Sequence, residues 1–401
     1  MARALMLLRA LMLTSLLFAT AQAEILVPGD PEEVGMSSER LGRLDEVVHT
    51  AIAQEEIPGA VVLVARKGKV VYRKAFGHRS LAPSQEAMTV DTVFDVASLT
   101  KVMATAPSVM ILVEEGKVSL TDPVSEYLPR FGRHGKDSIT VLQLLTHYSG
   151  LRPDLDLDKL WEGYETALEK AFQEEPVAPP GEEFIYSDIN YVVLAELVRE
   201  ASGKQLHTFA FERIFEPLGM TRTGFMPPEE LYPQIAPTEP RDGEMLHGIV
   251  HDLTAFRMGG FAGHAGLFST VYDAAIYAQM LLNKGEYNGV RILSPLSVLK
   301  MTTPQIPVGA TDWRGIGFDI RTRFSTSRGD LFPIGSFGHT GFTGTSLWID
   351  PYDEIFVILF TNRLHPDGSG DVSALRKRVA SVVAASIVEV PSLREQFYGR
   401  D

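Results

Sequence analysis

The stretch from Phe94 to Thr105, FDVASLTKVMAT, places a serine and a lysine three positions apart, at Ser98 and Lys101. An extended run leads into Ser98 and a long apolar helix pattern follows, so the pattern predicts a helix that begins at the serine. Three residues of helix put both side chains on one face, where an amine can take the proton of a hydroxyl. The alternative is a helix cap followed by a surface lysine. The spacing alone is weak evidence, because Ser297 and Lys300 share it inside a second helix pattern.

A second candidate site is Tyr186-Ser187-Asp188, which lies between a Pro-Gly turn and a helix pattern. A tyrosine on such a loop can present its hydroxyl to a cleft, where a nearby lysine would help it to act as a base. The alternative is structural, because Asp188 is a good helix-capping residue and Tyr186 could simply pack.

A third candidate is His339-Thr340-Gly341, on a predicted strand. Gly341 would let a ligand backbone approach the strand closely, while His339 and Thr340 could donate hydrogen bonds across a cleft. The alternative is a glycine-rich strand edge with a solvated histidine.

The elements that must position these residues alternate between helix and strand patterns. The patterns predict a helix from Ser37 to Pro58, a hairpin around Lys67-Gly68-Lys69, a helix from Ser98 towards Gly116 with a kink at Pro107, helices within 137–151 and 191–203, strands within 338–351 and 354–362, and a helix over about 372–388. We therefore expect an α/β (α+β) fold in which residues 24–95 and about 310–401 form one sheet and about 105–290 form a helical insertion. A cleft at the seam between them would hold the site.

The three motifs together resemble those of the penicillin-recognising serine hydrolases, in the same order and rough spacing. The resemblance is to the branch with class C β-lactamases, D-alanyl-D-alanine carboxypeptidases, D-aminopeptidases and related esterases. It spans nearly the whole chain and includes LLTHYSGL, residues 144–151, and the stretch 263–285. It implies a β-lactamase/transpeptidase-like fold, with an antiparallel sheet flanked by helices and an all-helical subdomain.

The resemblance also implies roles for the motif residues. Ser98 would be the acylated nucleophile, Lys101 its base partner, and Tyr186 the group that activates serine and later water. The backbone amides of Ser98 and Phe342 would form the oxyanion hole. The strand His339, Thr340, Gly341, Phe342 would pair with the substrate's acyl backbone.

Two positions depart from the family pattern. Asp188 stands where asparagine is usual, and an ionised carboxylate cannot donate a hydrogen bond to a substrate carbonyl. His339 stands where lysine is often found, and a neutral histidine would hold a substrate carboxylate less firmly. Both departures move the expected substrate away from efficient β-lactam destruction.

The first residues predict export. Arg3 and Arg9 precede an apolar run and the small-x-small triplet Ala21-Gln22-Ala23, which together predict a signal peptide over residues 1–23, followed by one hydrolase domain over 24–401. An uncleaved anchor is the alternative, but the run is shorter than the roughly 20 residues that a span needs. We expect a periplasmic or secreted protein without stable membrane insertion after cleavage.

The composition limits the other function classes. The net charge is −14 without a lysine-arginine block, which argues against nucleic acid as a partner. With no cysteine, the chain has no disulfide and cannot be a thiol enzyme. The sequence DLDLD at 154–158 lacks the glycine of a calcium loop, so we interpret it as solvated. The histidines His247, His251 and His264 lack a zinc-binding spacing, so a cleft position for His251-Asp252 or His264 is the better hypothesis.

These observations predict an exported serine hydrolase that needs neither metal nor organic cofactor. Its substrate would be a cell-wall peptide, a β-lactam or an ester, with a D-alanyl-D-alanine carboxypeptidase-like activity favoured. A promiscuous esterase with β-lactamase activity is the main alternative. A non-catalytic relative that binds wall fragments is a third hypothesis, against which Ser98, Lys101 and Tyr186 all count.

Overall fold

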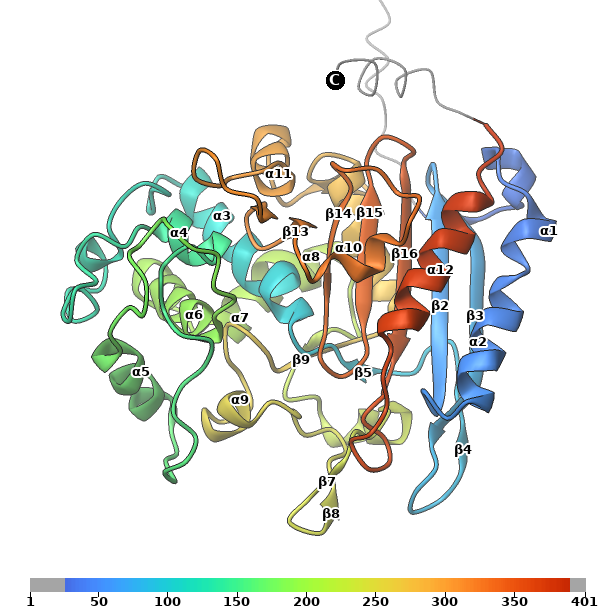
Figure 1. Cartoon of the computed structure of the whole chain (residues 1–401), viewed down its shortest axis with the longest axis horizontal. Helices are drawn as coiled ribbons and strands as arrows, with labels where there is room; N and C mark the ends of the chain where they lie inside the picture. The colour runs from blue at the N-terminus through green and yellow to red at the C-terminus, as the bar shows by residue number, and fades with distance from the viewer. Residues whose placement is uncertain (1–25, 390–401) are drawn as a thin grey trace, which may run out of the picture.

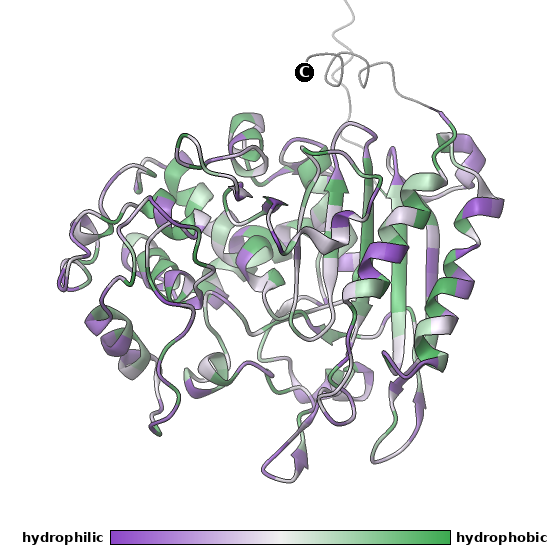
Figure 2. Cartoon of the chain, in the orientation of Figure 1, coloured by the Kyte–Doolittle hydropathy of each residue, from purple (hydrophilic) through white to green (hydrophobic). Residues whose placement is uncertain are grey.

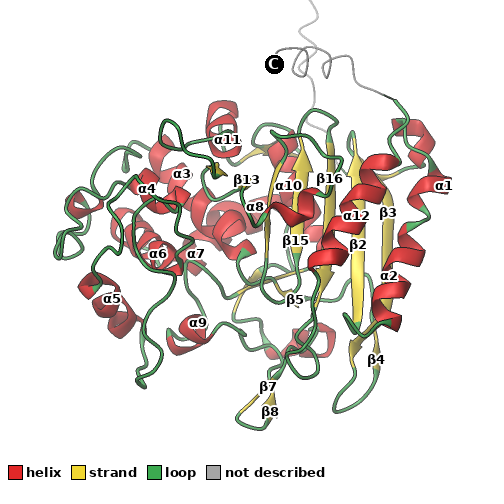
Figure 3. Ribbon diagram, in the orientation of Figure 1, coloured by secondary structure: helices red, strands yellow, loops and turns green. Residues whose placement is uncertain are grey.

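The computed structural model describes residues 26–389, so the predicted signal peptide lies outside the described residues. A large sheet occupies one side of the molecule and a group of helices the other (Figure 1, Figure 3). The sheet has the strand order β1-β3-β2-β16-β15-β14-β13-β12, and β4 (Glu86–Ala87) pairs with β3 in antiparallel register. The strands in that order are β1 (Val27–Pro28), β3 (Lys69–Ser80), β2 (Gly59–Arg66), β16 (Ile355–Thr361), β15 (Ser346–Asp350), β14 (Phe337–Thr340), β13 (Asp319–Arg321) and β12 (Trp313–Arg314).

The two ends of the chain meet in the middle of this sheet. Strand β16 pairs with β2 in antiparallel register from Ile355–Arg66 to Thr361–Ala60. The predicted hairpin is present as β2 and β3, which also pair antiparallel. The expected antiparallel sheet is confirmed except at its edge, where β1 pairs with β3 in parallel.

Helices cover both faces of the sheet. On one face lie α1 (Ser38–Leu41), α2 (Leu44–Ala53) and α12 (Ser373–Ala385), and on the other lies α10 (Val271–Leu282) (Figure 3). Val62 and Val64 of β2 pack in the core under α2 and α12, while Val61 and Leu63 pack in the larger core on the opposite face. Because both faces are buried, the central strands are apolar along their length (Figure 2). Helix α10 belongs to this sheet layer although it lies within the segment expected to be a helical insertion.

The remaining helices form the second layer (Figure 1). They are a π-helical turn (Lys101–Thr105) continued by α3 (Ala106–Glu114), then α4 (Val141–Thr146), α5 (Tyr164–Gln173), α6 (Asp188–Ser202), α7 (Leu206–Ala210) with a π-helical turn (Phe211–Phe215), α8 (Glu216–Leu218), α9 (Leu253–Arg257) and α11 (Pro295–Thr302). The irregularity predicted at Pro107 therefore precedes the proline, which has no N–H to bond back to the preceding turn. Gly203 ends α6 in the left-handed conformation, as its place in the sequence predicts.

Short strands link the two layers. Strand β9 (Leu267–Ser269) pairs with β5 (Phe94–Asp95) on one side and β6 (Gly224–Phe225) on the other. Two small hairpins complete the structure, β7 (Pro240–Arg241) with β8 (Glu244–Met245) and β10 (Glu286–Tyr287) with β11 (Val290–Arg291). No helix within residues 26–389 is long and apolar enough to cross a membrane.

Candidate active site

Ser98 lies at the turn that joins β5 to the first helix of the second layer. Ala97 adopts a left-handed φ of 46°, which costs a residue with a Cβ roughly 1 kcal/mol. The Asp95 carboxylate compensates by accepting a hydrogen bond from the Ala97 N–H at 2.8 Å. The helix begins at Leu99, so Ser98 stands at its exposed N-terminal end, as the sequence predicts.

Lys101 is fully buried and its ammonium has three partners. Its Nζ lies 3.0 Å from Ser98 Oγ, 3.1 Å from the His264 carbonyl and 2.6 Å from Asp188 Oδ1. Burial works to lower the pKa of Lys101, but the Asp188 carboxylate and the Tyr186 hydroxyl outweigh it, and the net pKa is raised. Lys101 is therefore a cation that donates to Ser98 Oγ in this structure, and must lose a proton before it can act as a base.

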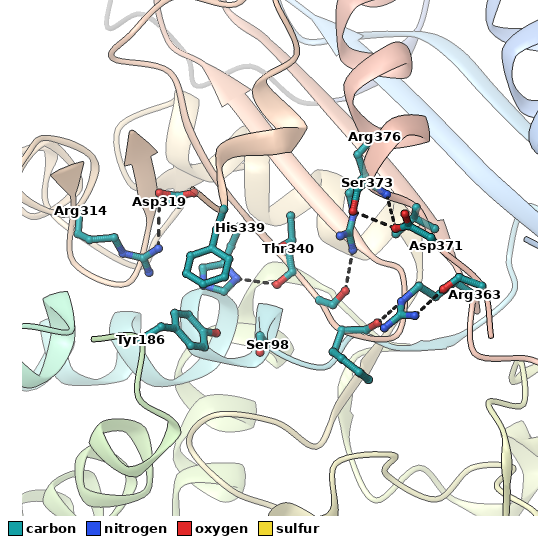
Figure 4. Close-up of a pocket in the computed structure, with 15 residues that line it drawn as sticks. Ser98, Tyr186, Arg314, Asp319, His339, Thr340, Arg363, Asp371, Ser373 and Arg376 are labelled. Atoms are coloured by element: carbon teal, nitrogen blue, oxygen red, sulfur yellow. Dashed lines mark hydrogen bonds and ion pairs between the residues drawn. The ribbon is translucent and has the colours of Figure 1, made fainter. Parts of the chain in front are cut away.

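Tyr186 lies across the cavity from Ser98 and points its hydroxyl towards it (Figure 4). Its ring stacks on His147 with a centroid distance of 4.4 Å. The Nδ1 of His147 accepts a hydrogen bond from the Ser187 N–H at 3.0 Å, which fixes the loop that carries the tyrosine. Burial, then the nearby Arg314 and Lys101 cations, hold the pKa of His147 well below its usual range, so the ring stays neutral.

Asp188 is the first residue of α6, but it does not cap the helix. Ser187 occupies the cap position, and the Asp188 carboxylate forms the ion pair with Lys101. The helix-capping interpretation of Asp188 is therefore wrong. Its role as a substrate contact stays a proposal, and an ionised carboxylate could not donate a hydrogen bond to a substrate carbonyl.

Strand β14 forms the opposite wall of the cavity with His339 and Thr340, followed by Gly341 and Phe342. The Nδ1 of His339 lies 2.8 Å from the Thr340 carbonyl, which can only accept, so Nδ1 carries the proton. Burial, then Arg314 and Lys101, hold the pKa of His339 well below its usual range, which leaves Nε2 as an acceptor. The expectation that His339 donates across the cleft is thus not supported. Gly341 is required, because a Cβ there would collide with Thr345 Oγ1 and the Val96 carbonyl.

The cavity beside Ser98 has a volume of about 370 Å³. Three arginines line it, Arg314, Arg363 and Arg376 (Figure 4). Arg314 pairs with Asp319 at 3.7 Å, whereas Arg376 Nε is buried without a hydrogen-bond partner among the described residues. The three guanidinium groups in the lining would favour an anionic group close to the nucleophile.

Several of these residues carry no chemical signal in the sequence. Arg314, Arg363 and Arg376 belong to no motif, and His147 stands out only as part of the landmark LLTHYSGL. The hydrogen bond between His147 and Ser187 joins two motifs 40 residues apart, so no local spacing signals it.

The histidines and the acidic run outside the motifs have separate partners. His247 Nε2 contacts the Ile235 carbonyl at 3.0 Å, His251 pairs with Glu239 at 2.5 Å, and His264 pairs with Asp252 at 2.9 Å. Neither His251 nor His264 lines the cavity; His251 stacks behind Phe342, and the His264 backbone supports Lys101. Among residues 26–389, no three His, Asp or Glu side chains are arranged to hold a metal ion.

The interpretation of DLDLD as solvated is wrong for Asp154. It is partly buried and accepts a hydrogen bond from Thr254 Oγ1 at 3.0 Å. Burial, opposed by His264, raises the pKa of Asp154 to about 6. The second Ser-x-x-Lys match takes no part in the site, because Ser297 bonds to Ser294 at the start of α11.

The beta-lactamase family profile matches residues 44–381 of this chain. The chain belongs to the beta-lactamase family. The assignment to the penicillin-recognising serine hydrolases and the predicted fold class are thereby confirmed. A curated relative from Salmonella schwarzengrund (strain CVM19633), named "Putative D-alanyl-D-alanine carboxypeptidase", is 32% identical over 378 residues, covering 85% of this chain and 87% of the relative.

Solved structures of other members of the beta-lactamase fold agree. The octameric penicillin-binding protein homologue from Pyrococcus abyssi is 27% identical with a TM-score of 0.69, over 88% of this chain and 79% of that one. EstCE1, described as a hydrolase with promiscuous acyltransferase activity, has a TM-score of 0.68 at 23% identity, over 86% of this chain and 99% of its own, and shows the shared fold alone.

Proposed function

We propose that this beta-lactamase family member is an exported serine hydrolase that acts through an acyl-enzyme at Ser98, with a D-alanyl-D-alanine carboxypeptidase-like activity on cell-wall peptides. The observation that carries the proposal is the contact between Ser98 Oγ and the buried Lys101 ammonium at 3.0 Å, with the Tyr186 hydroxyl directed at the same serine. Hydroxyl, cation and phenol meet at the end of one helix in a cavity large enough for a peptide terminus.

For the first step Tyr186 must already have released its own proton; Ser98 Oγ then attacks the substrate carbonyl, the serine proton passes to the Tyr186 phenolate, and the carbonyl oxygen takes up the negative charge. The Lys101 ammonium, whose Nζ lies 5.0 Å from the centre of the Tyr186 ring, favours negative charge on that side of the cavity while the proton moves. The same proton then passes to the leaving amine, and the carbonyl carbon stays bound to Ser98 as an ester. A water molecule attacks this ester by the reverse path, releasing the acid and the serine hydroxyl.

The arginines of the cavity support the carboxypeptidase-like activity. A wall peptide that ends in D-alanine carries a terminal carboxylate, which binds a guanidinium well. His339 is neutral and presents an acceptor, so it would not hold that carboxylate. Arg363, which lines the same cavity and is partly exposed, is the better candidate.

A promiscuous esterase is the second candidate function. The carboxylate of Asp188 and the acceptor nitrogen of His339 replace two groups that would recognise an amide substrate or its carboxylate. An ester needs neither contact, because its leaving group departs more easily than an amine.

The test is the intact mass of the purified protein after incubation with a penicillin, beside a Ser98→Ala control. A persistent adduct that the control lacks supports a wall peptidase with slow deacylation. No adduct and intact antibiotic favour the esterase, and no adduct with consumed antibiotic favours a β-lactamase. Unchanged turnover of both a D-Ala-D-Ala peptide and a p-nitrophenyl ester by Ser98→Ala would disprove the nucleophile.

A further inference from the structure

Two backbone N–H groups belong to residues that line the cavity beside the nucleophile, where the oxyanion of the proposed reaction would form. Ser98 and Phe342 both line the cavity, and neither backbone N–H has a hydrogen-bond partner among residues 26–389. Such donors stabilise a transition state only when their direction is fixed before the reaction. The structure indicates what fixes each of them.

The Phe342 N–H belongs to a peptide unit whose other end is the Gly341 carbonyl. Because a trans peptide is planar, the C=O and the N–H point in opposite directions as one rigid group. Arg376 Nη2 donates to the Gly341 carbonyl at 2.6 Å and to the Thr345 carbonyl at 2.7 Å. The Gly344 N–H also donates to the Gly341 carbonyl, at 3.1 Å, so Arg376 supplies the shorter, charged contact. Holding the Gly341 oxygen on one side therefore sets the direction of the Phe342 N–H on the other.

We propose that Arg376 is a positioning residue for the oxyanion hole. From helix α12 it holds and polarises the Gly341–Phe342 peptide, so that the Phe342 N–H meets the negative charge as it develops (Figure 4). A charge-assisted hydrogen bond on a carbonyl makes the N–H of the same amide a stronger donor. This inference rests on the proposed function, in which Ser98 becomes acylated.

The surrounding contacts agree with this role. Arg363 Nε donates to the Phe342 carbonyl at 2.7 Å, and its guanidinium lies 4.5 Å from the centre of the Phe342 ring. On the side that faces the nucleophile, Thr343 Oγ1 donates to the Asp95 carbonyl at 2.7 Å. The segment 341–345 is thus bonded to the arginines on one side and to the Ser98 turn on the other.

The Ser98 N–H is anchored in the same way by a local residue. Its peptide partner, the Ala97 carbonyl, accepts from Thr100 Oγ1 at 2.6 Å and from the Thr100 N–H at 3.0 Å. Each oxyanion donor is therefore held through the carbonyl of its own peptide unit. Thr100 lies two residues from Ser98, whereas Arg376 lies 34 residues beyond Phe342.

The test compares Arg376→Ala with the wild type in two assays. One measures kcat and KM for a p-nitrophenyl ester, and the other measures the inhibition constant of an aryl boronic acid. Boron accepts Ser98 Oγ and forms a tetrahedral anion with one oxygen in the oxyanion hole. Complete loss of one oxyanion donor costs roughly 100- to 1,000-fold in kcat, so a misdirected donor should cost roughly 10- to 100-fold. We expect this loss in kcat with little change in KM, and a proportional rise in the inhibition constant of the boronic acid. A merely structural role would not make the two effects proportional.

Rescue and a matched control sharpen the test. Added methylguanidine should restore part of the kcat of Arg376→Ala, because it can occupy the vacated space and donate to the same carbonyl. Arg378→Ala is the control on the same helix, since Arg378 pairs with Glu56 at 2.9 Å, and it should keep wild-type kcat. If Arg376→Ala does not fold, Arg376→Gln, which keeps one donor and loses the charge, replaces it in both assays.

Two results would overturn different claims. If Ser98→Ala abolishes ester turnover while the Arg376 variant keeps both kcat and boronic acid affinity within twofold of wild type, the positioning role is wrong and the proposed function stands. If Ser98→Ala turns over the ester at the wild-type rate, the proposed function itself fails.

Discussion

Replacing Asp188 by asparagine tests whether Lys101 works as a cation. Asp188 Oδ1 lies 2.6 Å from the fully buried Lys101 Nζ. At an effective dielectric constant of about 20, two unit charges at this distance attract each other by about 6 kcal/mol. The Asp188 side chain is 22% exposed, so solvent weakens the attraction, and we take about half, about 3 kcal/mol. That energy corresponds to a decrease of roughly a hundredfold in the proton affinity of Lys101.

The assay is the pH dependence of kcat/KM with a p-nitrophenyl ester. The pKa of Lys101 is raised in the native protein because Asp188 and Tyr186 outweigh the effect of burial. Asp188→Asn should bring it down, so kcat/KM should decline at a lower alkaline pH than in the wild type. A rise of kcat/KM at neutral pH in Asp188→Asn would refute the reasoning, because Lys101 would then be the base that Asp188 restrains.

Stability gives an independent reading of the same variant. A lysine with a raised native pKa stabilises the wild type below its unfolded pKa of about 10.4, and this contribution is lost only as the pH rises through the native pKa. If Asp188→Asn lowers the native pKa below the unfolded one, the unfolded chain binds more protons, and stability rises with pH up to about 10. Thermal unfolding between pH 7 and 10 measures this. Asp330→Asn, which breaks the exposed pair with Lys377, is the control and should show no such rise.

Two other predictions concern groups next to the cavity. Asp252 outweighs burial and raises the pKa of His264, so this pair stabilises the fold below about pH 6.5 and loses its effect as the pH rises through the raised value. In His264→Gln the thermal unfolding midpoint should therefore depend less on pH in that window. An unchanged dependence would contradict the pairing. Gly341→Ala forces a Cβ against the Val96 carbonyl and Thr345, which should lower the free energy of unfolding in denaturant by about 1–3 kcal/mol and remove most of the ester turnover. Wild-type values in both measurements would show that the segment can move aside.

The features that the sequence predicts well are local ones. The β2–β3 hairpin follows from two β-branched runs around Lys67 and Gly68, and the Ser98–Lys101 pair follows from three residues of helix. Both patterns depend on residues a few positions apart, where backbone geometry alone brings the side chains together.

The features that the sequence does not predict depend on distant segments. The ion pair of Asp188 with Lys101 is one such feature, because the two residues lie 87 positions apart and only the packing of α6 against the helix that carries Lys101 brings them together. Asp154 was interpreted as solvated because its partner Thr254 lies 100 residues further on. The contact of Arg376 with the Gly341 carbonyl crosses between the sheet and helix α12, where no spacing rule applies.

The meeting of both chain ends in the central sheet has a consequence for how the protein is made. Strand β2 is synthesised almost 300 residues before its partner β16, and helix α12 with Arg376 comes later still. A growing chain therefore carries the complete Ser98, Lys101 and Tyr186 set without the sheet centre or the segment 341–345. Pairing of such distant strands is slow, and the apolar strands keep unpaired edges exposed to solvent until their partners are synthesised. Hydrolase activity should consequently appear only after synthesis of the C-terminal helix, and a chain truncated before β16 should be inactive and prone to aggregate.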